Sequence, residues 1–142
     1  MSKTTDDLLK QLSNVNTLSE LKKYAASSNG ASHPLSLHEY LSVLISQSAI
    51  PVSELVRRSG IQRNYAYQIL SGAKHPGRDK IIALCISLNL SLDETQRALT
   101  IAKEGVLYPK NKRDSILIFS INKSMSVQET NELLYEMNEP VL

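Results

Sequence analysis

Hydrophobic residues recur at helical spacing along most of the chain, and runs of Ser, Asn, Gly and Pro separate the segments that carry them. The earliest segments are weak: residues 5–12 and 18–26 predict two helices, the second of which has a possible capping box of Thr17 and Glu20. The run SSNGASHP that follows is typical of a linker. We therefore expect residues 1–36 to form an N-terminal helical arm or a helical hairpin folded against the core.

The next two segments have stronger patterns. Ser36 forms a capping pair with Glu39 and introduces a helix whose hydrophobic face consists of Leu37, Tyr40, Leu41, Leu44 and Ser48. Residues 50–72 read IPVSELVRRSGIQRNYAYQILSG, and their spacing fits two short helices joined by a tight turn at Gly60. Such a unit must bury Leu55, Ile61, Ala66 and Ile69. The pattern predicts a helix-turn-helix.

The opposite side of the second helix in this unit is polar. At helical spacing, one exposed surface there carries Gln62, Arg63, Asn64, Tyr67 and Gln68. Amide and guanidinium groups along one side of a helix suit the paired donors and acceptors of base edges in the major groove of DNA. The pattern therefore favours a regulator that binds double-stranded DNA.

Residues 37–99 resemble the lambda-repressor and Cro type of helix-turn-helix, the XRE family of bacterial and phage regulators. The motifs that carry the resemblance are IPVSELVRRSGI, RNYAYQILSG with its closing glycine, a K-x-P turn at residues 74–76, and LNLSLDE. The resemblance implies an all-α, five-helix DNA-binding domain in a transcriptional regulator, for which we expect repression. It also implies base contacts by Arg63, Asn64, Tyr67 and Gln68, and phosphate contacts by Gln62, Ser71 and Lys74. Ser59 departs from the family pattern, because an apolar residue is usual there.

Basic residues are concentrated in the same region. Between residues 55 and 80 the only acid is Asp79, whereas the basic residues are Arg57, Arg58, Arg63, Lys74, Arg78 and Lys80. Clustered cations attract the phosphate backbone and release its counterions. Lys74 and Arg78 flank the turn that follows the recognition helix, so we expect both to contact phosphates. An ordinary solvated face is the alternative interpretation of this cluster.

Further helices are predicted downstream. One spans residues 78–88, and Ser91 with Glu94 begins another, whose apolar stripe is Leu92, Thr95, Leu99 and Ala102. This helix completes a DNA-binding domain of residues 37–105. Residues 114–122 include ILIF, which fits a helix or a buried strand. We favour a helix, because the chain offers no second strand to pair with.

A last helix begins at Ser126, which is spaced for a capping box with Glu129, and its apolar side consists of Val127, Thr130, Leu133, Leu134 and Met137. Residues 106–142 therefore form a C-terminal extension of two helices that the DNA-binding fold does not itself require. Its apolar surfaces suit a homodimer, which a DNA site of two half-sites demands, or completion of the domain's own core. Binding of a ligand or a partner protein is a third alternative.

Composition agrees with a small globular protein, since 142 residues with 42% hydrophobic side chains suit one domain with extensions. No apolar run approaches the roughly 20 residues needed to cross a bilayer, and the polar N-terminus lacks a signal-peptide core. We expect a cytoplasmic protein without a membrane partner. The single cysteine, Cys85, lies on an apolar stripe and is expected to be a buried core thiol.

Motifs for catalysis or metal binding are missing from the sequence. There is no His pair at metal-ligand spacing on one helix face, no Cys-x-x-Cys, no glycine-rich phosphate loop and no Gly-x-Ser-x-Gly elbow. We expect no enzyme activity, cofactor or metal. The main alternative to DNA binding is a protein-interaction module, in which Tyr65 and Tyr67 insert into a partner. An antitoxin-like regulator, which holds a partner protein through its acidic C-terminal helix, is a related alternative.

Overall fold

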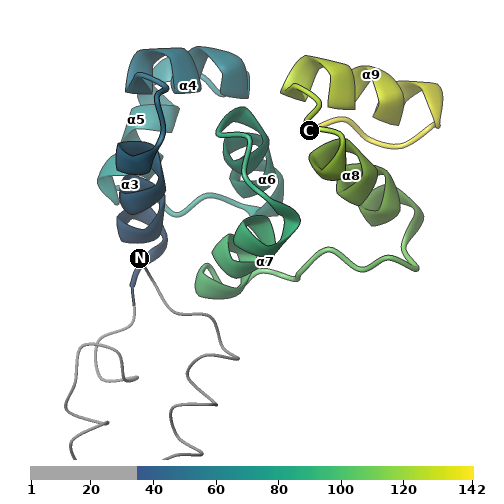
Figure 1. The fold of residues 1–142 in the computed structure, drawn as a ribbon, viewed down its shortest axis with the longest axis horizontal. Helices are drawn as coiled ribbons and strands as arrows, with labels where there is room; N and C mark the ends of the chain where they lie inside the picture. The colour runs from purple at the N-terminus through teal and green to yellow at the C-terminus, as the bar shows by residue number, and fades with distance from the viewer. Residues whose placement is uncertain (1–34) are drawn as a thin grey trace, which may run out of the picture. The chain divides into compact units, whose positions relative to one another are not determined.

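The computed structural model describes residues 35–142, and within this range it contains seven helices and no strand. The helices are α3 (Leu37–Gln47), α4 (Val52–Ser59), α5 (Arg63–Ser71), α6 (Arg78–Ser87), α7 (Leu92–Ile101), α8 (Lys112–Asn122) and α9 (Val127–Glu136) (Figure 1). The predicted all-α class is confirmed for these residues, and the ILIF segment is helical. The predicted N-terminal arm lies, except for its last two residues, outside the described residues.

Three of the described helices begin with the capping boxes that the sequence predicts. Ser36, Ser91 and Ser126 each accept a hydrogen bond from the backbone N–H of a glutamate three residues later, and that glutamate's carboxylate accepts the N–H of the serine. Each box satisfies donors that are otherwise unpaired at a helix N-terminus. These local contacts explain where α3, α7 and α9 begin.

Two glycines in the left-handed conformation bound the helix-turn-helix. Gly60 ends α4 with φ of 72°, and Gly72 ends α5 with φ of 86°. Side chains with a Cβ rarely adopt this conformation, so a glycine at each position allows the sharp change of direction. At Gly72 space is also short, because a Cβ there would lie 2.7 Å from the ring of His38 on α3. The predicted tight turn at Gly60 is confirmed.

The four side chains predicted to be buried in the helix-turn-helix are all buried, and they share a core with residues of α3 and α6. This core consists of Leu41, Leu55, Val56, Ile61, Ala66, Ile69, Leu84 and Leu88. Ser59, at the position where an apolar residue was expected, is 2% exposed. Its hydroxyl donates to the carbonyl of Val56 at 2.7 Å and accepts the N–H of Ile61 at 3.1 Å. The buried hydroxyl is therefore fully used in shaping the turn.

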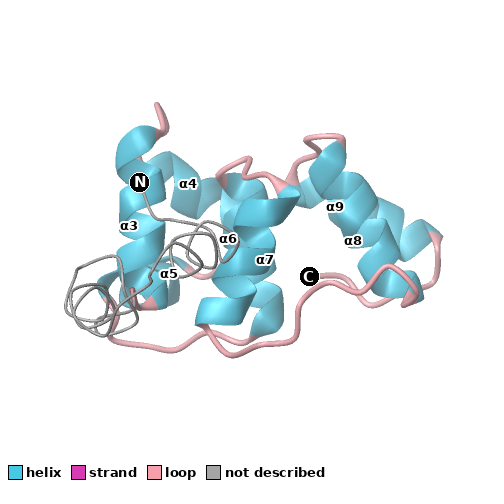
Figure 2. Cartoon of the chain, turned by 60° about the horizontal axis from the view of Figure 1, so that its bottom comes forward, coloured by secondary structure: helices cyan, strands magenta, loops and turns pink. Residues whose placement is uncertain are grey.

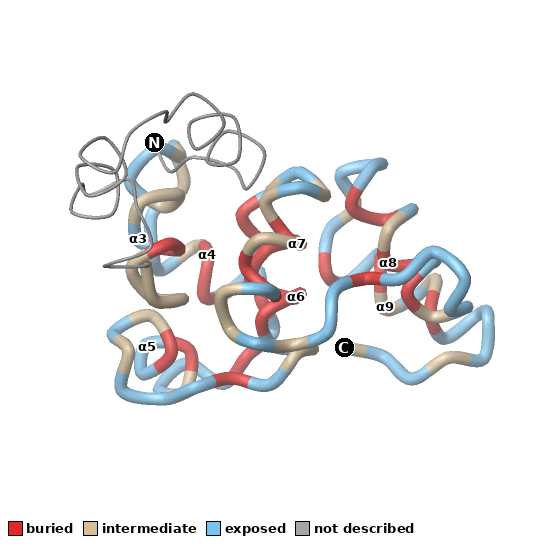
Figure 3. The backbone as a smooth tube through the Cα atoms, turned by 90° about the horizontal axis from the view of Figure 1, so that it is seen from below, coloured by how far each residue is buried: buried red, intermediate tan, exposed pale blue. Residues whose placement is uncertain are grey.

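Helix α6 lies at the centre of the fold. All residues from Ile81 to Ser87 are buried, as the continuous buried stretch of α6 in Figure 3 shows. The helix contacts α4, α7 and α9. Cys85 is among its fully buried residues, as predicted, and burial raises the pKa of the thiol to about 12.

The C-terminal helices pack on the same body as the helix-turn-helix. α8 contacts α7, α9 contacts α6, and residues 36–142 form one compact unit (Figure 2). Residues 106–142 thus pack against the helices of residues 37–105, as the core-completion alternative expects, and this packing leaves a dimer contact through their remaining surfaces open.

The hairpin of α8 and α9 repeats the hairpin of α6 and α7, with each equivalent residue 35 positions later, as in Arg78 and Arg113. Both copies begin with Arg-Asp and carry the motif Ser-x-x-Glu-Thr at the start of their second helix. Their turns agree as well: φ is 57° at Asn89 and 54° at Ser124, and the second helices are followed by φ values of 59° and 60°. The C-terminal half of the chain is an internal duplication.

Candidate nucleic-acid interface

The polar side of α5 is open to solvent in the described part of the chain. Ala66 and Ile69 are buried on one side of the helix, and the opposite side exposes Gln62, Arg63, Asn64, Tyr67, Gln68 and Ser71. In Figures 1 and 2, α5 lies at one end of the unit and α8 and α9 lie at the other, with α6 and α7 between them. The structure thus gathers the predicted contact residues on one surface, which we call the α5 surface.

Four side chains in the middle of this surface have polar groups that make no hydrogen bond or ion pair with the described residues. Arg63 and Tyr67 are one helical turn apart, and the guanidinium carbon lies 5.7 Å from the centroid of the tyrosine ring. Such a cation–π contact restricts the arginine without occupying its N–H donors. The side-chain amides of Asn64 and Gln68 make no hydrogen bond to the described residues. These groups present both donors and acceptors to solvent.

Gln62 has a structural role in addition to its exposed position. It is the N-cap of α5, and its Oε1 accepts the backbone N–H of Tyr65 at 2.8 Å. The cap positions the first turn of α5 and leaves the Nε2 amide nitrogen as the group that can reach a phosphate. The predicted contact by Gln62 is thus limited to one end of the side chain.

Ser71 is the last residue of α5, and Lys74 lies in the turn that follows. The Ser71 hydroxyl donates to the Gln68 carbonyl at 3.1 Å, and the backbone N–H of Lys74 donates to the same carbonyl at 3.1 Å. Pro76 is buried and fixes the chain on the core. The side chain of Lys74 is exposed and has no ion pair within the described residues, so it places a positive charge beside the C-terminal end of α5.

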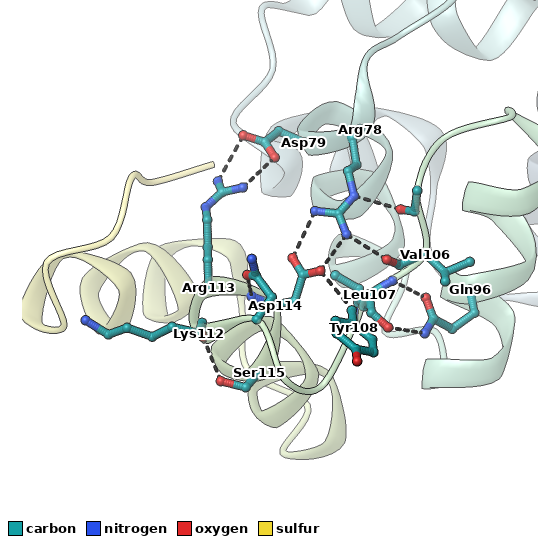
Figure 4. A network of polar contacts seen from close by, with 12 residues as sticks. Arg78, Asp79, Gln96, Val106, Leu107, Tyr108, Lys112, Arg113, Asp114 and Ser115 are labelled. Carbon is teal, nitrogen blue, oxygen red and sulfur yellow. Dashed lines mark hydrogen bonds and ion pairs between the residues drawn. The ribbon is translucent and has the colours of Figure 1, made fainter.

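Arg78 differs from what the sequence suggested, because its guanidinium group is used inside the fold (Figure 4). It donates to the carbonyls of Gly105 and Val106 at 2.7 and 2.9 Å, and to both carboxylate oxygens of Asp114 at 2.9 and 2.8 Å. This geometry ties α6 to α8 and leaves little of the group for a phosphate. The expected phosphate contact by Arg78 is therefore replaced by a structural role.

Asp114 is the anionic partner in this arrangement and is 5% exposed. Burial acts to raise the pKa of its carboxyl group, but the Arg78 guanidinium and the N–H of Tyr108 outweigh burial, so the pKa lies below its ordinary value. The carboxylate is accordingly ionised where it meets Arg78, and the pair is a charged one.

The second hairpin contains the same arginine arrangement. Arg113 pairs with both oxygens of Asp79 at 2.9 Å (Figure 4). It also donates to the carbonyl of Pro140 at 3.0 Å. Each arginine therefore binds the C-terminal end of its own hairpin and the aspartate of the other hairpin. This reciprocal exchange, which the sequence analysis did not anticipate, joins the two repeats.

Ion pairing reduces the positive charge that the sequence count assigned to the helix-turn-helix. Arg57 and Arg58 share the carboxylate of Glu54, one residue outside the counted stretch. Hydrogen bonds from the two arginines lower the pKa of this carboxyl to about 2. With Arg78 paired to Asp114, the basic residues of the stretch without an ion pair in the described part are Arg63, Lys74 and Lys80.

A groove of about 940 Å³ lies away from the α5 surface, between α4 and α9. Its walls carry charges of opposite sign, with Arg57 and Arg58 on α4 and Glu129 and Glu132 on α9. Residues 35–142 contain no group of three side chains suited to hold a metal ion. None of their helices is both long and apolar enough to cross a membrane.

No family model matches the chain, and neither a curated protein nor a solved structure is detectably similar to it.

Proposed function

We propose that this protein binds double-stranded DNA through the α5 surface and regulates transcription, with repression as the expected outcome. The observation that supports the proposal is the exposure, on one side of α5, of Arg63, Asn64, Tyr67 and Gln68, whose polar groups make no hydrogen bond or ion pair within residues 35–142. The buried side of α5 is fixed against the core, so the helix is a rigid support for these groups. An α-helix of this kind fits the major groove of B-form DNA.

Different residues along α5 are suited to contact bases and phosphates. Arg63 is in the first turn, which reaches deepest into the groove in proteins that use a helix-turn-helix. With its guanidinium held over Tyr67, it is suited to bind guanine O6 and N7. Asn64 and Gln68 have the amide groups that pair with adenine. These three residues are proposed to provide most of the sequence specificity.

Phosphate contacts are proposed for Gln62, Ser71 and Lys74, at the two ends of α5. Within the described residues, Arg63, Lys74 and Lys80 are the basic residues of this stretch without an ion pair, so electrostatic affinity is proposed to come from few charges. Each phosphate neutralised adds about 0.9 to the slope of log affinity against log salt. For Lys74→Ala, the slope of log affinity against log salt is expected to be smaller than that of the native chain by about one, on every DNA sequence.

The decisive experiment is selection of bound fragments from random duplex DNA with the purified full chain. We expect the bound fragments to share an enriched sequence. The ratio of the affinities for this site and for a scrambled duplex then gives the specificity. Arg63→Ala should weaken binding to the enriched site by about 1–3 kcal/mol, and it should weaken binding to the scrambled duplex much less. Lys110→Ala, which removes an exposed charge from the loop before α8, is the matched control.

Two results contradict the proposal. Failure to enrich any sequence rules out specific binding, and equal losses by Arg63→Ala on both duplexes rule out base contact. A palindromic site would also require two copies of the chain, since each copy presents one α5.

The alternative of a protein-binding module has less support. Tyr65, one of the two tyrosines proposed to enter a partner, is partly buried and packs against the core, whereas Tyr67 is 37% exposed. Salt separates the two functions, because binding through phosphates weakens by orders of magnitude as salt rises and an apolar protein interface hardly responds.

A further inference from the structure

The internal repeat provides a reference for judging the surface of α8 and α9. Residues that face the interior have the same burial in both copies: Ile81 and Ile116 are 0% and 4% exposed, and Leu99 and Leu134 are both 0% exposed. Equivalent positions therefore point the same way in the two hairpins. Where a position is buried in the first hairpin and its equivalent is exposed in the second, other helices cover that face of the first hairpin and leave the same face of the second hairpin exposed.

One such surface is the face of the first hairpin that packs on the helix-turn-helix. Leu84 and Leu88 lie there, 0% and 5% exposed, in the core shared with α3, α4 and α5. Their equivalents on the second hairpin are Phe119, which is 50% exposed, and Lys123, which is exposed. The second hairpin thus has a large aromatic residue at a position where the first hairpin binds other helices.

Neighbouring positions support this comparison. Ala83 and Ala98 are buried in the first hairpin, at 3% and 0% exposure, and their equivalents are the larger residues Ile118 and Leu133, both partly exposed. No described helix covers this face of α8 and α9. We call it the Phe119 face, consisting of Ile118, Phe119, Lys123 and Leu133. An exposed patch of this kind around an aromatic residue is typical of a binding surface.

We propose that the Phe119 face binds the same face of a second copy of this chain and forms a two-fold homodimer. Charge complementarity supports a second copy as the occupant. α9 exposes Glu136, outside the groove towards α4, and contains no basic residue, whereas Lys123, at the end of α8, has no ion pair within the described residues. A two-fold axis across the face sets α8 of one copy against α9 of the other. Each lysine then faces the acidic helix of its partner.

At the centre of this interface Phe119 is the anchoring side chain. Lys123 lies 5.9 Å from the centroid of its ring, so the lysine forms the polar rim beside the aromatic residue. Aromatic residues near the centre of an interface dominate its binding energy, and charges at the rim mainly select the partner. The inference is independent of DNA binding, because the Phe119 face and the α5 surface share no residue.

The test measures the oligomeric state of the full chain without DNA, by sedimentation over a range of protein concentrations. The native chain is expected to dimerise, and Phe119→Asp should weaken the dimer at least about 30-fold, the loss expected for an anchoring residue. Tyr135→Asp is the matched control. Tyr135 is more exposed, at 78%, and lines the groove towards α4 instead of the Phe119 face. Far-ultraviolet circular dichroism establishes that both variants are folded.

A second arm tests the charge pairing. Lys123→Glu and Glu136→Lys should each dimerise weakly, while an equimolar mixture should form a heterodimer, because each altered charge then faces its opposite. Restoration in the mixture requires that Lys123 of one copy faces α9 of the other. A native chain that stays monomeric into the high micromolar range overturns the proposal. Equal effects of Phe119→Asp and Tyr135→Asp also overturn it, because they indicate association without a specific face.

Discussion

Replacement of Asp114 by asparagine isolates the energetic role of the contact between the two repeats. The carboxylate is 5% exposed and accepts hydrogen bonds from Arg78 and from the N–H of Tyr108. Asp114→Asn keeps the shape of the side chain but leaves the Arg78 charge, 26% exposed, without its anion. Breaking a buried pair costs about 3–5 kcal/mol. Because Arg78 keeps two carbonyl partners and some contact with water, we expect a loss of about 2–3 kcal/mol in the free energy of unfolding.

The equivalent position in the other repeat offers a matched control. Asp79 also binds an arginine through both oxygens, but its side chain is 44% exposed. Asp79→Asn should therefore cost about 1 kcal/mol or less. Urea unfolding of the full chain, followed by circular dichroism, measures both losses. Equal losses would show that burial does not decide the strength of these pairs, and an unchanged midpoint for Asp114→Asn would refute the reasoning altogether.

The same pair predicts a pH dependence. The pKa of Asp114 is lower in the folded protein than its ordinary value of 3.8, so the folded state holds the ionised form more strongly than the unfolded chain does. Its contribution to stability is present above the ordinary value and is lost as the pH falls through the lower pKa of the folded state. Asp114→Asn should accordingly flatten the acid side of the curve of stability against pH.

Three further predictions concern local features. Gly60→Ala, in open space at φ of 72°, should cost about 1–2 kcal/mol, and Gly72→Ala should cost more, because its Cβ also meets His38; urea midpoints of the two variants test this order. Cys85, whose pKa burial raises to about 12, should react with a thiol reagent only after unfolding, and rapid labelling of the native chain would contradict this. Ser126→Ala should lower stability by about 1 kcal/mol through loss of the capping box, as thermal unfolding can measure.

Local features of the fold could be predicted from the sequence because their causes lie within a few residues. The boxes at Ser36, Ser91 and Ser126 depend on a glutamate three positions away, and the turn at Gly60 depends on one backbone conformation. The helical form of the ILIF segment followed from a wider argument, the lack of a strand to pair with it. The exposed side of α5 also agrees with its helical spacing.

Features that depend on tertiary contacts could not be predicted in this way. The partner of Arg78 lies 36 positions away, and only the packing of α8 brings Asp114 to it. A count of charges in one stretch therefore overestimated the free positive charge near α5. The internal repeat, in contrast, is visible in the sequence, because Arg-Asp and Ser-x-x-Glu-Thr each recur 35 positions later. The helical period of a single segment does not reveal it, because the repeat is a relation between two segments.

The complete burial of the middle of α6 has a consequence for how this protein unfolds. The helix-turn-helix packs on α6 through Leu84 and Leu88, and α9 contacts the same helix, so the helix-turn-helix and the C-terminal hairpin both depend on α6. Loss of α8 and α9 would expose part of α6 and separate Arg78 from Asp114. Residues 36–142 should therefore melt in a single all-or-none transition. Cleavage after Gly105 would remove the contact of α9 with α6 and the pair of Arg78 with Asp114, and should therefore lower the stability of the remaining helices. A destabilising substitution in α9 should likewise reduce the fraction of molecules in which α5 is formed.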